Sequence, residues 1–266
     1  MTAARRPGPR ARAALLAASA AAALTGCTTG ESDDTTLTVY AAASLSEAFE
    51  LIAADFEAAH EGVDVRLNVG GSAGLVAQVQ QGAPADVLAT ADTRTMDALV
   101  ADDLVGTPRA FATNTLQIAV PPGNPADVMG LADLVDPALH LVVCAPEVPC
   151  GAATTAVAAR AGLVLRPASE EQSVTDVLGK VSSGEADAGL VYVTDVARAG
   201  DQVEGIAFPE ADAAVNTYPI AAIDRTGRTG RTGRTADQAE LAQAFVDSVL
   251  ADGGRATLAD IGFAAP

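Results

Sequence analysis

Four turns in this sequence pass from a short apolar run into a helical pattern through serine, glycine or cysteine. They are Tyr40 to Glu47 (YAAASLSE), Val69 to Leu75 (VGGSAGL), Pro146 to Gly151 (PEVPCG) and Ser173 to Asp176 (SVTD). The first N–H groups of a helix lack an intrahelical acceptor, so such turns present backbone donors that attract anions. Each serine alone is also explained by helix capping, and Ser44 with Glu47 matches a capping box. Four such turns together favour an anion site.

Nucleophilic catalysis and metal binding have little support in the residues. The chain has two histidines, His60 and His140, and no Gly-x-Ser-x-Gly elbow. The carboxylates are scattered without the spaced cluster that a metal ion needs. A secreted serine hydrolase that uses Ser44 or Ser72 with one of the histidines is the alternative from another class of protein.

The charge balance excludes nucleic acid as a partner. The chain of 266 residues has 34 acidic and 16 basic side chains, a formal charge of −18. Phosphate backbones select basic surfaces, and this chain has none of the required excess of lysine and arginine. The few basic residues of the first 26 are arginines near the start, and no acidic residue accompanies them. The N-terminal segment is therefore distinct from the acidic body.

That N-terminal segment has the pattern of a targeting signal. An arginine-bearing start precedes an apolar stretch over 13–24, and Leu24-Thr25-Gly26-Cys27 resembles a bacterial lipobox. The stretch is too short to span a bilayer, although an uncleaved anchor or a buried helix is an alternative. We expect residues 1–26 to be a lipoprotein signal peptide, Cys27 to be lipidated, and 27–36 to form a flexible tether to the outer face of the cell membrane.

From residue 37 onward, the alternation of apolar runs and helical spacing predicts an α/β fold with a largely parallel sheet. We expect strands at 37–41, 63–69, 86–90, 116–120, 141–145, 188–193 and 218–223. We expect helices at 45–59, 74–81, 93–101, 152–161, 174–183 and 236–250, the last one ended by Gly253. Ligands of open α/β sheets lie beyond the carboxyl ends of the strands, where the four turns would converge if two lobes face each other.

Several of these pieces together resemble the periplasmic molybdate-binding proteins of ABC transporters, which have the type II periplasmic binding fold. The resemblance runs from about 37 to 263 through VYAAASL at Val39, GAPADV at Gly82, PEVPCG at Pro146, GLVY at Gly189, Tyr218-Pro219 and Gly262-Phe263. It implies two lobes, each a mostly parallel sheet flanked by helices, with the ligand in the cleft between them. We expect lobe 1 to comprise 37–113 plus 219–266, with a flexible Arg-Thr-Gly loop at 225–235 to which we assign no function. We expect lobe 2 to comprise 114–218.

The resemblance also implies how the ligand is held. Molybdate, or tungstate, would be bound by neutral donors alone, without a cation, an arginine or a cofactor. Carried over by motif, these donors are the hydroxyls of Ser44 and Ser72, the backbone N–H groups of Cys150 and Val174, and the phenol of Tyr192. Without the resemblance, Tyr192 would be interpreted as a core aromatic residue, and Tyr218-Pro219 is expected to cross between lobes without touching the ligand.

Two departures from the family pattern are visible. Gly70-Gly71 replaces a more serine-rich approach to Ser72, and Cys150 stands where the family often has a small residue such as alanine. Once Cys27 is acylated, Cys144 and Cys150 are the two thiols left in an oxidising compartment, so we expect a disulfide that holds the turn carrying the Cys150 N–H. Two reduced structural thiols are the alternative.

The function implied by the resemblance is transport without catalysis. A monomeric, lipid-anchored protein would capture the oxyanion outside the cell and deliver it to a membrane permease driven by an ATPase subunit. A fully deprotonated oxyanion needs only donors, whereas a protonated phosphate also needs an acceptor. A binding protein for sulfate or another oxyanion is the nearest alternative, and a structural lipoprotein without a ligand is a further one.

Overall fold

The computed structural model describes residues 35–224 and 235–266. The expected signal peptide, Cys27 and residues 27–34 of the expected tether lie outside these ranges, as do residues 225–234 of the Arg-Thr-Gly loop. Within the described ranges, no helix combines the length and the apolar character needed to cross a bilayer.

The described chain forms two five-stranded sheets, and we call each sheet with the helices packed on it a lobe. The first sheet has the order β2-β1-β3-β10-β4 and the second β7-β6-β8-β5-β9. In the first, the strands are β1 (Thr35–Ala42), β2 (Val63–Gly70), β3 (Val87–Ala89), β4 (Arg109–Asn114) and β10 (Asn216–Ala222). In the second, they are β5 (Leu116–Val120), β6 (Leu141–Cys144), β7 (Ser169–Glu171), β8 (Ala188–Tyr192) and β9 (Glu204–Ile206).

Each sheet has a parallel half and an antiparallel half. In the first sheet β1 pairs in parallel with β2 and β3, while β10 runs antiparallel to β3 and β4. In the second sheet β6 pairs in parallel with β7 and β8, while β5 runs antiparallel to β8 and β9. Because β4 and β9 are each antiparallel to a reversed strand, four of the five strands in each sheet run in one direction and only β10 or β5 is reversed, so the expected mostly parallel sheets are confirmed.

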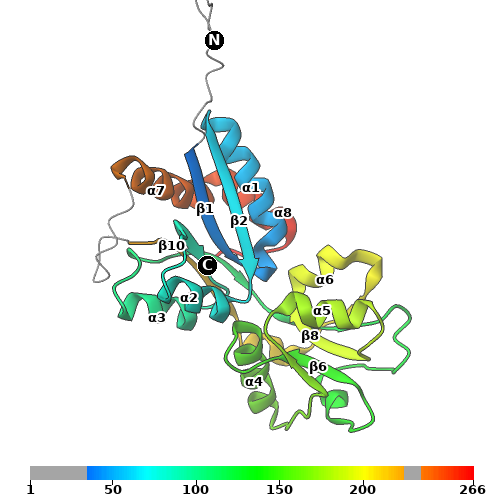
Figure 1. Ribbon diagram of the computed structural model, residues 1–266. Coiled ribbons are helices and arrows are strands. Elements are labelled where there is room, and N and C mark those ends of the chain that lie inside the picture. Colours follow the sequence, from blue (N-terminus) through cyan, green and yellow to red (C-terminus); the bar gives the residue numbers. More distant parts are fainter. Residues whose placement is uncertain (1–34, 225–234) are drawn as a thin grey trace, which may run out of the picture. The chain divides into compact units, whose positions relative to one another are not determined.

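Helices cover both faces of the first sheet. On one face lie α1 (Ser46–Ala59), α7 (Ala236–Leu250) and α8 (Asp252–Ile261), and on the other lie α2 (Ser72–Gln80) and α3 (Thr93–Ala101) (Figure 1). The alternation along β1 explains this, because Val39 and Ala41 pack with the first group of helices and Tyr40 with the second. A strand buried on both faces is apolar along most of its length, as VYAA is.

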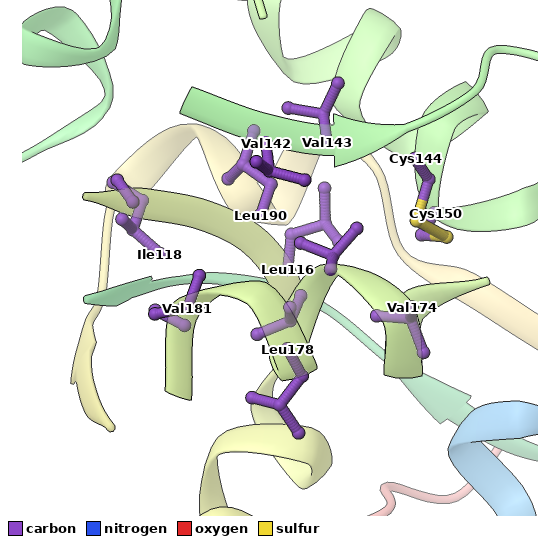
Figure 2. Close-up of a cluster of buried hydrophobic side chains, with 14 of the residues drawn as sticks. Leu116, Ile118, Val142, Val143, Cys144, Cys150, Val174, Leu178, Val181 and Leu190 are labelled. Atoms are coloured by element: carbon purple, nitrogen blue, oxygen red, sulfur yellow. A yellow bond between two sulfur atoms is a disulfide. The ribbon is translucent and has the colours of Figure 1, made fainter. Parts of the chain in front are cut away.

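The second sheet packs against α4 (Pro149–Ala161), α5 (Val174–Ser182) and α6 (Val193–Ala199). Its core contains Leu116 and Ile118 from β5, Val142 from β6 and Leu190 from β8, with Leu178 of α5 beside them (Figure 2). Four 3₁₀ turns complete the described elements: η1 (Ala43–Leu45), η2 (Leu131–Val135), η3 (Gly200–Gln202) and η4 (Pro209–Ala213).

Several elements differ from the sequence-based expectation. Besides the 3₁₀ turns, the described residues contain five strands and α-helices that we did not predict: β4, β7, β9, α6 and α8. Helix α7 ends at Ala251 in an extended conformation, so Gly253 is not its left-handed stop and lies instead in the first turn of α8. The two adjacent glycines in the first turn of α8 are poor helix formers, so the sequence did not indicate this helix. Gly254 is required there, because a Cβ would lie 2.5 Å from the Ser248 carbonyl oxygen.

The edges of the expected lobes also shift. Strand β1 begins at Thr35, whose N–H donates to the Gly62 carbonyl at 2.7 Å, so the last two residues of the expected tether belong to the sheet. Tyr218 pairs with Ala112 in the first sheet, which the chain therefore reaches before residue 219. Thr235, the last residue of the expected loop, caps α7 by accepting from the Gln238 N–H at 3.2 Å.

Candidate functional site

The four turns singled out in the sequence meet at one small pocket. It lies where β1, β2, β6, β7 and β8 end, so the carboxyl ends of strands from both sheets converge on it. Its lining residues are Ala42, Ala43, Ser44, Gly71, Ser72, Ala91, Val148, Pro149, Cys150, Gln172, Ser173, Val174 and Tyr192. All five of the predicted ligand-binding residues are among them.

Ser44 does not cap a helix, which corrects the predicted capping box with Glu47. It lies in η1, and the N-cap position of α1 falls on Leu45, which makes no side-chain capping bond. The Ser44 Oγ lies instead 3.0 Å from the Tyr218 hydroxyl, and both side chains are buried. A partner 174 residues away in sequence has replaced the local one.

Ser72 is the first residue of α2 and reaches the pocket from the other turn of the first lobe. Its Oγ accepts a hydrogen bond from the Ala91 N–H at 3.0 Å, and the side chain is buried. The Ala91 carbonyl in turn accepts from the Asn216 side-chain amide at 2.8 Å. Since the Ser72 oxygen already accepts a bond, its proton is available to a ligand.

Cys150 is the second residue of α4, after Val148 at the N-cap and Pro149 at the first helical position. Its N–H has no acceptor within the helix at that position. Cys150 is bonded to Cys144 at the end of β6, with an S–S distance of 2.04 Å, and Figure 2 shows this disulfide beside the strand. Gly151 follows because a Cβ there would lie 1.9 Å from the Ala145 carbonyl oxygen. The loop between the cysteines is therefore tightly folded.

Val174 begins α5, and its N–H is likewise without an intrahelical acceptor. Ser173 caps this helix by accepting from the Asp176 N–H at 3.2 Å, while its hydroxyl donates to the Asp176 carboxylate at 2.7 Å. The Val174 side chain is buried in the core of the second lobe, where Figure 2 shows it at the start of the helix. The side chain anchors the turn in the core, and the residue is also among those that line the pocket.

Tyr192 ends β8 and has a hydroxyl without a partner. Among the described residues, it is the one buried side-chain polar atom for which the protein supplies no hydrogen bond. Its side chain is 1% exposed, and burial raises the pKa of this phenol well above its usual value, with nearby Tyr218 adding to the effect. An unsatisfied buried hydroxyl costs about 1–3 kcal/mol, so a ligand that accepts its proton would relieve that cost.

The carboxylate of Asp195 holds the backbone of Tyr192 by a hydrogen bond. Asp195 is fully buried and accepts from the Tyr192 N–H at 3.1 Å, while the Arg198 guanidinium donates to its other oxygen at 3.1 Å. Burial raises the pKa of Asp195, and the Arg198 charge and hydrogen bond oppose that rise. Neither residue lines the pocket, so this pair holds the start of α6 without presenting charge to a ligand.

The lining of the pocket has no ionisable side chain apart from the phenol of Tyr192. It offers hydroxyls and first-turn N–H groups, which are the donors that suit an anion rich in acceptor oxygens. Over the described ranges, no group of three or more histidine, cysteine or acidic residues is arranged to hold a metal ion. The arrangement can therefore bind an anion by hydrogen bonds alone.

The hydrolase alternative lacks its base. The His60 Nδ1 bonds the Phe56 carbonyl oxygen at 2.8 Å and its ring stacks on Phe56, while the His140 backbone N–H bonds Asp187. The hydroxyl partners found for Ser44 and Ser72 are a phenol and a backbone amide. Neither serine is paired with a histidine in the described part of the chain, so the geometry of an activated nucleophile is missing there.

Sequence reasoning missed the residues behind the pocket. Tyr218 was expected only to cross between the lobes, yet its hydroxyl bonds Ser44, and Asn216 and Ala91 support Ser72. Gln172 lines the pocket without having been singled out. Buried tyrosine and asparagine in one apolar strand were the available signal, because such residues need partners, but the sequence does not say which partners they find.

Two sheets whose strand ends meet at one donor-lined pocket are the arrangement expected of a solute-binding protein. The family model for bacterial extracellular solute-binding proteins matches residues 37–264, and the chain belongs to this family. It is therefore a binding protein that acts outside the cytoplasm, not an enzyme.

Within and beyond this family, the chain is similar to individual proteins whose ligands are known. The chain is 46% identical over 231 residues to the molybdate-binding protein ModA of Mycobacterium tuberculosis, covering 86% of this chain and 85% of that protein. The fold is similar to the periplasmic molybdate-binding protein of Azotobacter vinelandii, with a TM-score of 0.65, 21% identity and coverage of 86% and 99%. It is also similar to the sulfate-binding protein SubI of Mycobacterium tuberculosis, with a TM-score of 0.67, 21% identity and coverage of 86% for each chain.

Proposed function

We propose that this protein captures molybdate outside the cell and delivers it to an ABC importer. The observation that carries the proposal is the buried, unpartnered hydroxyl of Tyr192. It lies in a pocket whose other donors are also neutral. Molybdate is an acceptor-only dianion and would take up that hydroxyl. The identity of 46% with a molybdate-binding protein supports molybdate as the ligand, and tungstate, with the same shape and charge, is expected to bind as well.

In this proposal, five donors hold the anion. The first lobe contributes the hydroxyls of Ser44 and Ser72, and the second contributes the N–H groups of Cys150 and Val174 and the phenol of Tyr192. Such donors are effective without a counter-charge because hydrogen bonds strengthen in a site from which water is excluded. The net charge of −18 repels anions at long range, so the affinity has to come from these short-range contacts.

The proposal extends to how the protein is held and with what it works. Lipidation of Cys27 would keep the protein at the outer face of the membrane beside its permease. The loaded protein, as a monomer, would present the ligand to that permease, whose ATPase subunit drives uptake. No cofactor takes part.

Calorimetry and thermal unfolding test the ligand directly. Purified protein, stripped of bound anions, is titrated with molybdate, tungstate, sulfate and phosphate. At 100 times the dissociation constant a ligand adds about 2.7 kcal/mol to the free energy of unfolding, so molybdate and tungstate should raise the melting temperature clearly. Phosphate, which is partly protonated at neutral pH, should bind more weakly because the pocket lining offers no carboxylate to accept its proton.

Two variants sharpen the result. Ser44→Ala should weaken molybdate binding, whereas Ser183→Ala, which removes an exposed hydroxyl of the second lobe, should leave it unchanged. Tighter binding of sulfate than of molybdate would make the protein a sulfate-binding protein. Absence of a thermal shift with every one of the four anions would refute the proposal.

A further inference from the structure

Strand β10 is connected by hydrogen bonds to both pocket serines, directly to Ser44 and through Ala91 to Ser72. From β10, Tyr218 places its hydroxyl 3.0 Å from the Ser44 Oγ. From the same strand, Asn216 donates to the Ala91 carbonyl at 2.8 Å, and the Ala91 N–H donates to the Ser72 Oγ at 3.0 Å. Tyr218 and Asn216 do not line the pocket.

We propose that β10 presets both serine hydroxyls as donors, with Tyr218 acting directly on Ser44 and Asn216 acting on Ser72 through Ala91. Both are positioning residues, because they would act on the anion only through another residue. This inference rests on the proposed function and deepens it, since it assigns the orientation of the donors and the discrimination between bare and protonated oxyanions to a strand outside the binding site.

The direction of the hydrogen bonds follows from proton counting. A serine hydroxyl has one proton and two lone pairs. An oxyanion without protons can only accept, so a serine that binds it must turn its own proton toward the ligand. The Ser44 oxygen is then left as an acceptor for Tyr218, and the Ser72 oxygen already accepts from Ala91. Each chain of bonds therefore runs from the protein through the serine to the anion, and each bond polarises the next.

The packing around Tyr218 fixes its hydroxyl in position to donate to Ser44. Its side chain is 0% exposed, and its ring packs against those of Phe263, Tyr192 and Phe111 with centroid distances of 5.4, 6.0 and 6.3 Å. The surrounding rings hold the phenol in one position. Burial raises the pKa of Tyr218 far above the usual value of a phenol, so its proton is present at every physiological pH.

Selectivity is a consequence of the same arrangement. With two lone pairs, the Ser44 oxygen could accept from both Tyr218 and a proton on the ligand, but its own proton would then no longer have the anion as its acceptor. Hydrogen phosphate, which carries a proton in need of an acceptor, is thus disfavoured at Ser44 and at Ser72. Removing the Tyr218 hydroxyl frees Ser44 to rotate, and this should relax the preference for molybdate over phosphate as well as weaken molybdate binding.

The test is a double-mutant cycle on the purified protein, with molybdate as the probe in calorimetry. Tyr218→Phe should raise the dissociation constant about tenfold in the wild-type background, and less than about twofold in the Ser44→Ala background, where the acceptor is gone. The ratio of phosphate to molybdate dissociation constants should fall. Tyr40→Phe removes a phenol hydroxyl from another buried cluster of the first lobe and should change neither quantity.

A second cycle covers the case in which Tyr218→Phe does not fold. Asn216→Ala should weaken molybdate binding about fivefold in the wild-type background and should have little effect in the Ser72→Ala background. If Tyr218→Phe, or Asn216→Ala, weakens binding equally with and without its serine, or leaves it unchanged while the wild type binds molybdate, the inference is wrong. A wild type that binds none of the oxyanions would instead refute the proposed function.

Discussion

A buried phenol without a partner is the residue-scale feature on which the proposed function of this protein rests. Tyr192 has 1% of its side chain exposed, and its hydroxyl finds no acceptor or donor among the described residues. The other donors of the pocket are locally explicable, since helix N-termini and serines occur for structural reasons too. An unsatisfied hydroxyl is different, because folding gains nothing from it. It is therefore the part of the pocket that best indicates a ligand.

This difference predicts that stability and binding respond in opposite ways to Tyr192→Phe. Without ligand, the free energy of unfolding should stay the same or rise by up to about 1 kcal/mol, because a buried unsatisfied group is removed. Molybdate binding should weaken by about 1–3 kcal/mol. Urea denaturation and calorimetry measure the two quantities.

Val174→Ala is the matched control for that variant. It shortens the core side chain of a pocket residue but keeps the backbone N–H, so molybdate affinity should change little, although the lost core packing lowers stability. Unchanged affinity in Tyr192→Phe would remove the phenol from the set of ligand donors.

At the scale of elements, short segments set the geometry of the pocket. The disulfide between Cys144 and Cys150 closes the loop before α4, and Gly151 lets the helix start tightly against it. On the other side, β7 leads into α5 through Gln172 and Ser173. The Lys180 ammonium of α5 bonds the Glu171 carboxylate and, at 3.1 Å, the Ser169 hydroxyl. The turn that carries the Val174 N–H is thus held from both ends.

The pair of Glu171 and Lys180 predicts a pH-dependent contribution to stability. The Lys180 hydrogen bond holds the pKa of Glu171 below its ordinary 4.5, although burial opposes this. A lowered pKa in the folded state means that the stabilisation is complete above the ordinary value and disappears as the pH falls through the folded value. Lys180→Met should therefore cost about 0.5–1 kcal/mol at neutral pH, since the pair is partly exposed, and less at about pH 3.

Urea denaturation of wild type and variant at the two pH values measures this difference. Arg66→Met is the control, because the Arg66–Asp64 pair is open to solvent, with side chains 70% and 43% exposed, and should contribute little at either pH. A loss for Lys180→Met that is the same at both pH values would show that its methylene packing, not its charge, supports the turn.

At the scale of the whole molecule, the two lobes touch beside the pocket. A Cβ on Gly71 of the first lobe would lie 2.0 Å from the carbonyl oxygen of Gln172 in the second lobe. Nearby, Arg94 of the first lobe donates to the Glu147 carbonyl of the second at 2.8 Å. Ligand-dependent closure by a hinge motion would need this approach, since donors from both lobes must reach one small anion.

Gly71→Ala should hinder that approach. The backbone at Gly71 has φ −64° and ψ 132°, which alanine adopts without strain, so the added methyl acts only through its collision with Gln172. We expect molybdate to bind about 10- to 100-fold more weakly, and the decrease in radius of gyration on binding to be smaller. Small-angle scattering and calorimetry measure these effects.

Gly74→Ala provides the comparison, because a Cβ there meets no atom within 4 Å in the same helix. It should leave binding unchanged and stabilise α2 by up to about 1 kcal/mol. Equal binding by Gly71→Ala and Gly74→Ala would mean that the ligand is held without the close contact of the lobes.

The sequence by itself determined the elements whose pattern is local. Strand β5 and helices α3 and α7 have the predicted bounds, because apolar spacing and capping residues act over one or two turns of chain. The four turns were also identifiable, since serine, glycine and proline report the start of a helix directly. The family resemblance indicated which of their groups to bring together, and the structure places all five around one pocket.

Only the tertiary structure decided what those groups bond to. Strands β7 and β9, of three residues each, exist through pairing with β6 and β5 and leave little trace in the sequence. Ser44 belongs to a plausible local capping box, but a phenol 174 residues away takes its hydroxyl. Local periodicity specifies which face of an element is buried. The choice of a partner for a buried polar group depends on the packing of segments distant in sequence, which no local pattern contains.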